Sequence, residues 1–365
     1  MRKYDAAVLF GGISNENEIS VITGTMVCNV LKKGGKIILP LYVSQEGKIY
    51  AGEELADIDN FKADGYKRCS TACIADGGVV LFNRRGKPSK RVSVDCAVNC
   101  CHGGDGEGGG ASGLFFMNNI PFASAGLFES AAFMDKYYTK VVLKSLGVKV
   151  APYVYLRHIS GATSAAEQIG FPLIVKPCKL GSSIGVVKCE NLTRLHAALA
   201  AAFEYDDGAI IEKFYSDRRE INCAAYFSCA KCVTSECEEA FSKGDLLSYD
   251  DKYAGGGKSV YPADIPQSTA EEIKNTTAYV YKSLNMRGIV RFDYLIADGE
   301  VILSEINTVP GSLSYYLLSG GFSDFYRVLD AVIKQAKADF VARRGKRLIN
   351  TGIINNFTSN ACKIK

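Results

Sequence analysis

Strand-like and helix-like segments alternate through the first third of the sequence, and this pattern limits the possible folds more than any other feature. The β-rich runs are short and apolar, and they lie at 6–12, 36–44 and 95–100. A helix-like stretch from about 20 to 33 separates the first two runs. Because such alternation is typical of a parallel sheet with helices on both faces, we expect a doubly wound α/β domain at the N-terminus.

Glycine-rich chain follows two of these strands, at Gly11 and after His102. Ligands bind beyond the carboxyl ends of the strands in such sheets, so both loops are candidate binding sites. Neither loop has the GxGxxG order followed by a suitable acid, and a dinucleotide site is therefore not expected.

Length and composition indicate a soluble globular protein with more than one domain. The 365 residues suffice for two or three domains of about 150 residues each. No run approaches the roughly 20 apolar residues that cross a membrane, so we expect no membrane partner. Thirteen cysteines cannot all pair, which favours reduced thiols and a cytoplasmic location.

Charge is distributed unevenly along the chain. The net charge is +4, but residues 341–365 hold six basic residues and no acidic residue, which leaves a body of net charge −2. Such a body lacks the broad basic stripe of a nucleic-acid binder, so we do not expect nucleic acid as a partner.

Strand and helix signals in the rest of the chain suggest three domains and a tail. Boundaries near 121 and 214 separate an N-terminal α/β domain, a central subdomain and a C-terminal subdomain. The predicted segments are 1–121, 122–214, 215–347 and the tail 348–365.

The segment from Ser130 to Gly147 is predicted to form one amphipathic helix, with a serine N-cap and a glycine stop. Lys136, Lys140 and Lys144 lie four residues apart on its polar face. By spacing alone, a solvated lysine stripe is the simplest interpretation of all three.

The most informative stretch for chemistry is RFDYLIADGEVILSEINTVPG, at 291–311. In a strand, Arg291 and Asp293 share one face, and Glu305 and Asn307 share one face of the next strand. Carboxylate and amide oxygens suit Mg²⁺, which combines one or two carboxylates with nucleotide phosphates. A solvated hairpin face is the alternative interpretation.

The register of these two strands decides whether their carboxylates can meet. A two-residue turn at 298–299 would place Asp293 opposite Ser304 and direct Glu305 to the other face. A shared metal site therefore requires a loop with an odd number of residues. We predict a three-residue loop at 298–300, with a positive φ angle within it.

A second candidate site follows the strand that ends near Lys176. Lysine neutralises phosphate as a point charge, and the glycine-rich loop 181–185, with Ser182 and Ser183, can bring backbone amides close to phosphate oxygens. The loop lacks the order GxxxxGK[ST], so it is not a P-loop. An ordinary hairpin connection is the alternative.

Further charged residues follow predicted strands. Glu212 and Lys213 end one strand, with Glu220 soon after, and such charges either contact an adenine edge and ribose hydroxyls or simply lie in water. Glu16 follows Gly11-Gly12, and His102 and Glu107 lie in CHGGDGEGGG. Carboxylates on glycine-rich loops can bind an ammonium group that a histidine helps to orient, although surface loops without function look the same.

Together, these motifs resemble the D-alanine-D-alanine ligase family of peptidoglycan synthesis, which has the ATP-grasp fold. The matching runs lie within residues 4 to about 335 and read LFGGISNENEIS, HGGDGEGG, FMDK, IVKPCKLGSSIG, IIEKF, DKY and RFDYLI…SEINTVPG. The resemblance implies ATP-dependent ligation of two D-amino acids, first of all D-alanine with D-alanine, through an acyl phosphate. It also implies two Mg²⁺ ions, a cytoplasmic enzyme and a homodimer.

The resemblance further implies a role for individual residues. Glu16, with Ser182 and Tyr253, would hold the ammonium of the first D-alanine and close a lid. Arg291 and the amide of Gly311 would stabilise the tetrahedral intermediate. The implied nucleotide contacts are Lys136, Lys176, Ser183, Glu212, Lys213, Glu220 and Lys252. The implied substrate contacts are His102, Glu107 and Tyr316, and the implied Mg²⁺ ligands are Asp293, Glu305 and Asn307.

The sequence departs from the family pattern mainly around the acceptor. Glu107 is followed by glycine where the family usually has aspartate, Ser112 replaces a usual glutamine, and Tyr316 replaces a small hydroxyl residue. Glu220 follows Lys213 at one residue more than the usual spacing. The lid tyrosine favours an amine acceptor over D-lactate. D-serine as acceptor, or a nucleotide-binding sensor with weak catalysis, stays open as an alternative.

Overall fold

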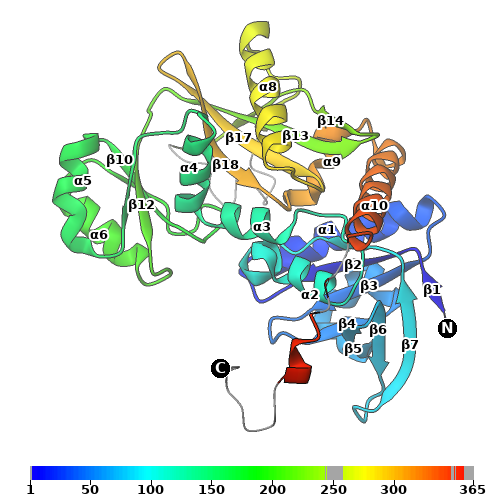
Figure 1. Cartoon of the computed structure of the whole chain (residues 1–365). Helices are drawn as coiled ribbons and strands as arrows, with labels where there is room; N and C mark the ends of the chain where they lie inside the picture. The colour runs from blue at the N-terminus through cyan, green and yellow to red at the C-terminus, as the bar shows by residue number, and fades with distance from the viewer. Residues whose placement is uncertain (1, 243, 245–257, 347–348, 350, 357–365) are drawn as a thin grey trace.

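A computed structural model describes residues 2–242, 244, 258–346, 349 and 351–356, and it contains three β-sheets (Figure 1). The first sheet has eight strands in the order β1-β7-β6-β5-β4-β3-β2-β8. Their bounds are β1 Lys3–Tyr4, β2 Ala6–Gly11, β3 Ile38–Val43, β4 Ile49–Ala51, β5 Ser70–Ala75, β6 Gly78–Phe82, β7 Pro88–Val94 and β8 Ala97–Asn99.

The parallel centre predicted for this sheet is confirmed, since β2 pairs in parallel with β3 and β8. The sheet also contains an antiparallel extension from β4 to β7 that the sequence did not predict. These strands are short and partly exposed, so they lack the continuous apolar runs of buried parallel strands.

Helices cover both faces of the first sheet, as expected. On one face, α1 (Asn17–Lys33) and α10 (Phe322–Arg344) bury Leu31 and Phe325 against Phe10 of β2. On the other face, α2 (Ala111–Met117) packs through Phe115. Because α10 comes from the far end of the chain, the C-terminal region helps to build the N-terminal core (Figure 1).

The second sheet is antiparallel, with the strand order β11-β10-β12-β9. Its strands are β9 Tyr153–Leu156, β10 Leu173–Pro177, β11 Val187–Cys189 and β12 Ala209–Lys213. The helices α5 (Ala162–Ile169) and α6 (Leu192–Ala202) bury small apolar side chains against it and form one outer end of the molecule (Figure 1). Asn191 caps α6 by accepting a hydrogen bond from the amide of Arg194.

The third sheet has the order β16-β15-β13-β17-β18, with β14 paired to β13. Its strands are β13 Arg219–Ser228, β14 Lys231–Thr234, β15 Glu238–Phe241, β16 Lys258–Val260, β17 Val290–Ala297 and β18 Glu300–Asn307. Three helices, α3 (Leu127–Met134), α4 (Lys136–Ser145) and α8 (Gln267–Ser283), pack on its core. Short helical elements lie at Glu53–Ala56, Ile58–Arg68, Gly106–Gly110, Ile159–Gly161, Gly311–Ser314, Tyr315–Leu318 (α9) and Ile353–Asn356. Among the described helices, none has both the length and the apolar composition needed to span a bilayer.

The single helix predicted from Ser130 is wrong, because the chain breaks at Asp135 into α3 and α4. Asp135 has an extended backbone, and its carboxylate accepts hydrogen bonds from the amides of Tyr137 at 2.9 Å and Tyr138 at 3.3 Å. An N-cap at this position satisfies the first amides of α4 and therefore starts a new helix.

The prediction of a three-residue loop at 298–300 is also wrong. Ala297 pairs with Glu300 across a two-residue turn in which both residues have positive φ. A β-bulge restores the predicted partnership, because the register shifts between Tyr294, which faces Leu303, and Asp293, which faces Glu305. The extra residue of the predicted loop is therefore supplied by Ser304 within β18.

Candidate active site

A cavity of about 600 Å³ is lined by strands of the second and third sheets, by helix α1 and by loops that include those after β2 and β8 of the first sheet. Every candidate residue in the described part of the chain lines it. These residues are Glu16, His102, Glu107, Lys136, Lys176, Ser182, Ser183, Glu212, Lys213, Glu220, Arg291, Asp293, Glu305, Asn307, Gly311 and Tyr316. Lys252 and Tyr253 lie outside the described residues, and of the predicted lid, residues 253–260, only 258–260 are described.

The paired strands β17 and β18 place a set of oxygen ligands on the cavity wall. Asp293 lies opposite Glu305, and Asn307 lies opposite Arg291. The Arg291 guanidinium donates to both oxygens of Asp293, at 2.7 and 2.8 Å, and the side-chain amide of Asn307 donates to Asp293 Oδ2 at 2.9 Å. Two carboxylates and one amide oxygen form a hard donor set that fits Mg²⁺ when phosphate oxygens complete it.

Protein donor groups alone do not complete a metal site in the described chain. No group of three His, Cys, Asp or Glu side chains suited to a metal occurs among the described residues. This donor set therefore suits an ion that arrives with a nucleotide better than a permanent structural metal.

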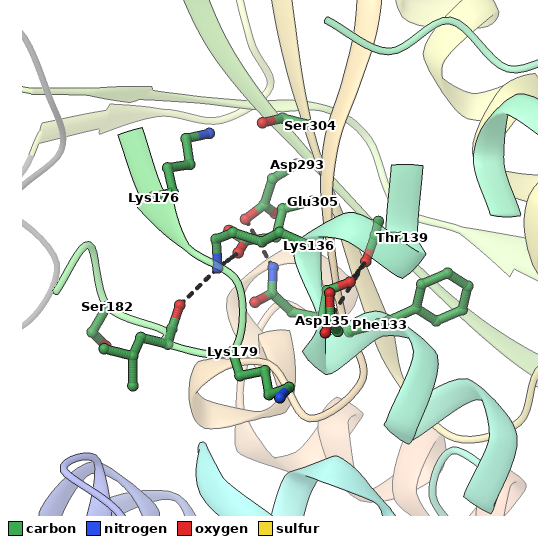
Figure 2. A network of polar contacts seen from close by, with 12 residues as sticks. Phe133, Asp135, Lys136, Thr139, Lys176, Lys179, Ser182, Asp293, Ser304 and Glu305 are labelled. Atoms are coloured by element: carbon green, nitrogen blue, oxygen red, sulfur yellow. Dashed lines mark hydrogen bonds and ion pairs between the residues drawn. The ribbon is translucent and has the colours of Figure 1, made fainter. Parts of the chain in front are cut away.

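Lys136 begins α4 and links two walls of the cavity. Its Nζ lies 3.0 Å from Glu305 Oε1 and donates to the carbonyl of Leu180 at 2.7 Å, and Figure 2 shows it directed at Glu305. Burial lowers the pKa of Lys136, but the charge and hydrogen bond of Glu305, together with the charge of Glu212, outweigh burial, so the pKa is raised. Lys136 is therefore held as a cation beside the candidate metal ligands.

The solvated lysine stripe is wrong for two of its three members, because Lys136 is mostly buried and Lys140 is 1% exposed. Lys140 Nζ lies 3.0 Å from Glu212 Oε1, and Lys176 Nζ lies 2.8 Å from Glu212 Oε2. Burial raises the pKa of Glu212, but the two lysines outweigh it and lower the pKa to about 2. Lys144, the third member, is exposed as predicted.

Glu16 and the glycine-rich loop after β10 meet at one side of the cavity. The Ser182 hydroxyl donates to Glu16 Oε1, which brings together two of the three predicted members of that group. A Cβ atom on Gly181 or on Gly103 would lie 2.6 Å from Glu16 Oε2, so both loops need glycine to approach the carboxylate this closely.

His102 lies on the loop after β8 and is a buried member of the cavity lining. Its Nε2 lies 2.8 Å from the hydroxyl of Thr23 on α1, which also accepts from the amide of Ser312 at 3.1 Å. Burial lowers the pKa of His102 to about 4. Sequence analysis missed Thr23, because a threonine within a buried helix face carries no distinguishing signal.

Glu107 joins the same loop to the chain after β18. Its carboxylate accepts from the amides of Gly103 at 2.8 Å and Val309 at 3.3 Å. Burial raises the pKa of Glu107 to about 7, and the nearby carboxylate of Glu16 contributes to that increase. The described geometry makes Glu107 a link between the loops that line the cavity.

Two predicted nucleotide contacts have protein partners at the cavity rim. Lys213 Nζ lies 2.8 Å from Asp298 Oδ2 at the turn between β17 and β18. Glu220 lies 2.9 Å from Arg218. Both residues line the cavity, but their charges are also compensated by these neighbours.

The segment after β18 presents Gly311 and Tyr316 to the cavity. A Cβ atom on Gly311 would meet no neighbour within 4 Å, so its backbone is open on that side. Tyr316 lies in the helical turn α9, and its hydroxyl accepts from Arg291 Nη1 at 3.5 Å. The tyrosine ring therefore lies beside the candidate oxyanion arginine.

Comparison with known proteins identifies the family. A family model described as D-ala D-ala ligase N-terminus matches residues 5–125, and one described as D-ala D-ala ligase C-terminus matches residues 142–321. A D-alanine-D-alanine ligase of Thermosipho africanus is 33% identical, covering 94% of this chain and 95% of that protein.

Solved structures agree with this assignment. The D-alanine-D-alanine ligase from Helicobacter pylori superposes with a TM-score of 0.75 at 29% identity, covering 91% of this chain and 98% of that one. The VanG D-Ala:D-Ser ligase from Enterococcus faecalis superposes with a TM-score of 0.76 at 24% identity, covering 92% and 99%, and this likeness concerns the fold alone. The chain belongs to the D-alanine-D-alanine ligase family, and its fold is the ATP-grasp fold of that family.

Proposed function

We propose that this protein joins two molecules of D-alanine at the expense of ATP, yielding D-alanyl-D-alanine, ADP and phosphate for peptidoglycan synthesis. One observation supports this above all: lysines from one side and paired carboxylates from the other meet in a single cavity beside an arginine. Phosphoryl transfer depends on such positioning and charge neutralisation more than on covalent chemistry by the protein.

The nucleotide would lie between the second and third sheets. Lys136 and Lys176 would neutralise its phosphates, with Ser183 and the glycine-rich loop nearby, while Glu212 and Glu220 would approach the base and ribose. Lys213 and Lys252 would complete the nucleotide contacts. Asp293, Glu305 and Asn307 would hold Mg²⁺, which when bound neutralises charge on the phosphoryl oxygens.

The reaction has two steps. The carboxylate of the first D-alanine, whose ammonium Glu16 would hold, attacks the γ-phosphorus of ATP, and ADP leaves. The amine of the second D-alanine attacks the resulting acyl phosphate, the bond from carbon to the phosphate oxygen breaks, and the amine loses a proton. Arg291 and the amide of Gly311 would stabilise the negative oxygen of the tetrahedral intermediate.

Phosphate release with MgATP tests this function. We expect D-alanine to stimulate release strongly and the dipeptide to accumulate in equal amount, with L-alanine as the matched control. Phosphate release that no amino acid stimulates would contradict the proposal and favour a nucleotide-binding sensor.

Tyr316 distinguishes the proposed acceptor pocket, because it stands where the family pattern has a small hydroxyl residue. Because its hydroxyl already accepts from Arg291, the ring occupies space beside the reacting centre. We expect D-alanine to be the acceptor but to bind weakly, and Tyr316→Ser to change the acceptor KM more than the ATP KM. Unchanged constants for D-alanine, D-serine and larger D-amino acids would place Tyr316 outside the acceptor site.

We also propose the domain boundaries, the cellular location and the oligomeric state of the protein. Boundaries near 121 and 214 are supported by the change of sheet after 99 and after 213. A cytoplasmic location is supported by the cysteines in the described chain, which are free thiols. The homodimer that the resemblance implies stays a prediction, which light scattering of the purified protein tests.

A further inference from the structure

One buried lysine, Lys140, does not line the cavity but contacts a residue that does. Lys140, on α4, is 1% exposed and does not line the cavity, whereas its partner Glu212 and the neighbouring Lys176 do. The Lys140 ammonium lies 3.0 Å from Glu212 Oε1 and 3.4 Å from the carbonyl oxygen of Ser304 in β18. It therefore touches strands of two different sheets on either side of the proposed nucleotide.

The charges of this group form a simple pattern. Glu212 carries one negative charge and accepts from one lysine on each carboxylate oxygen, with Lys140 on Oε1 and Lys176 on Oε2. When all three groups are charged, the side chains together carry one net positive charge, and Lys176 is the lysine of the group that lines the cavity. Without Lys140, Lys176 and Glu212 would form a neutral pair.

We propose that Lys140 is a positioning residue that compensates Glu212, so that the positive charge of Lys176 acts on the phosphates of ATP. The inference rests on the proposed function, because it requires ATP in this cavity. It concerns a residue that touches neither nucleotide nor metal in the arrangement proposed above. Its effect is electrostatic and is therefore directed at the charged part of the nucleotide.

Binding of MgATP and of adenosine to the full-length protein separates this role from a structural one. A structural role would disturb the whole nucleotide site and weaken both ligands. We expect Lys140→Met to weaken MgATP by about tenfold or more, the size expected for loss of a nearby charge, and adenosine by less than about twofold. Lys144→Met, the same substitution one turn further along α4, is the matched control and is expected to bind both ligands normally.

A double-mutant cycle with Glu212 tests the charge explanation itself. In the Glu212→Gln background, the carboxylate that Lys140 compensates is absent, so adding Lys140→Met is expected to change MgATP affinity by less than about twofold. If Lys140→Met does not fold, Lys140→Gln gives the same comparison, since it keeps a donor near Glu212 without the charge.

Two results would overturn the inference. Equal weakening of MgATP and adenosine would make Lys140 a structural residue, and normal MgATP affinity in both Lys140 variants would remove its role altogether. Failure of the proposed function looks different, because the unmodified protein would then bind no MgATP or would bind it without any phosphate release that D-alanine stimulates.

Discussion

At the level of single residues, Glu305 connects the paired strands β17 and β18 with helix α4. It lies opposite Asp293 in the paired strands and contacts the Lys136 ammonium from α4. In the proposed function, its carboxylate would exchange this lysine partner for a metal ion when a nucleotide binds.

Glu305→Gln is expected to lower turnover by about two orders of magnitude, because it removes a negative charge from the proposed metal ligands. The fold should survive, since the side chain is partly exposed. Glu300→Gln on the same strand is the matched control, because Glu300 is exposed at the turn. Near-normal turnover of Glu305→Gln at saturating Mg²⁺ would contradict the assignment.

His102 and Glu107 are expected to give the fold opposite dependences on pH. The pKa of His102 falls from 6.5 to about 4, so the folded state binds fewer protons and loses stability as pH falls through that window. The pKa of Glu107 rises from 4.5 to about 7, so the folded state binds more protons and gains stability as pH falls from 7 to 4.5.

Urea unfolding between pH 4.5 and 8 tests both signs. Relative to the unmodified protein, His102→Gln should become more stable as pH falls, and Glu107→Gln should become less stable. Each change in the free energy of unfolding should reach roughly 2 kcal/mol, allowing for solvent near half-buried Glu107. Parallel pH curves for the three proteins would show that neither side chain changes its protonation on folding.

Single residues also show how far sequence alone can predict this site. The motifs pointed to Lys176, Asp293 and Glu305, which the structure brings together on one cavity wall, because short strands fix the direction of neighbouring side chains. Spacing could not reveal that Lys140 is buried, because the same helical period describes a solvated face and a face covered by another sheet. Long-range packing decides between them.

At the level of elements, a helix N-cap and a β-bulge bring the site residues together. Asp135 stops α3 and starts α4, and this places Lys136 at the first turn of a new helix. The bulge at Ser304 brings Glu305 opposite Asp293 despite a two-residue turn. The sequence predicted the partnership of the carboxylates but assigned the extra residue to the loop, because a bulge in mid-strand has no reliable signal in a single sequence.

Asp135→Ala is expected to lower the free energy of unfolding by about 1 kcal/mol, since the amides of Tyr137 and Tyr138 lose their partner. We also expect a higher KM for ATP, because Lys136 begins the helix that Asp135 caps. Asp135→Asn keeps an acceptor and should retain most of both properties. A variant as stable as the unmodified protein would show that the cap does not determine the start of α4.

At the level of the whole molecule, a helix near the C-terminus packs against the N-terminal domain. Helix α10 packs in the core of the first sheet, although the predicted boundaries assign it to the C-terminal subdomain. Helices α3 and α4 pack on the third sheet although they precede the second. A local pattern predicted α3 and α4 as a single helix. The packing partners of all three helices lie far away in sequence, so a boundary drawn along the chain could not describe their packing.

The basic tail is expected to be dispensable for ligation. Within its described part, Ile349 and Ile354 are 83% and 82% exposed, so they bury little apolar surface. A protein ending at Arg347, without residues 348–365, should keep its turnover and remain soluble, as steady-state assays and gel filtration would show. Loss of solubility would instead indicate that the tail packs on the body.

The central claim, ligation through an acyl phosphate, is tested most directly by following oxygen. D-Alanine labelled with ¹⁸O in its carboxylate is incubated with the protein and MgATP, and the released phosphate is analysed by mass spectrometry. The proposed mechanism predicts one ¹⁸O atom in each phosphate released, because the attacking carboxylate oxygen leaves with phosphorus when the second amine forms the peptide bond. Unlabelled phosphate accompanying dipeptide formation would contradict the mechanism.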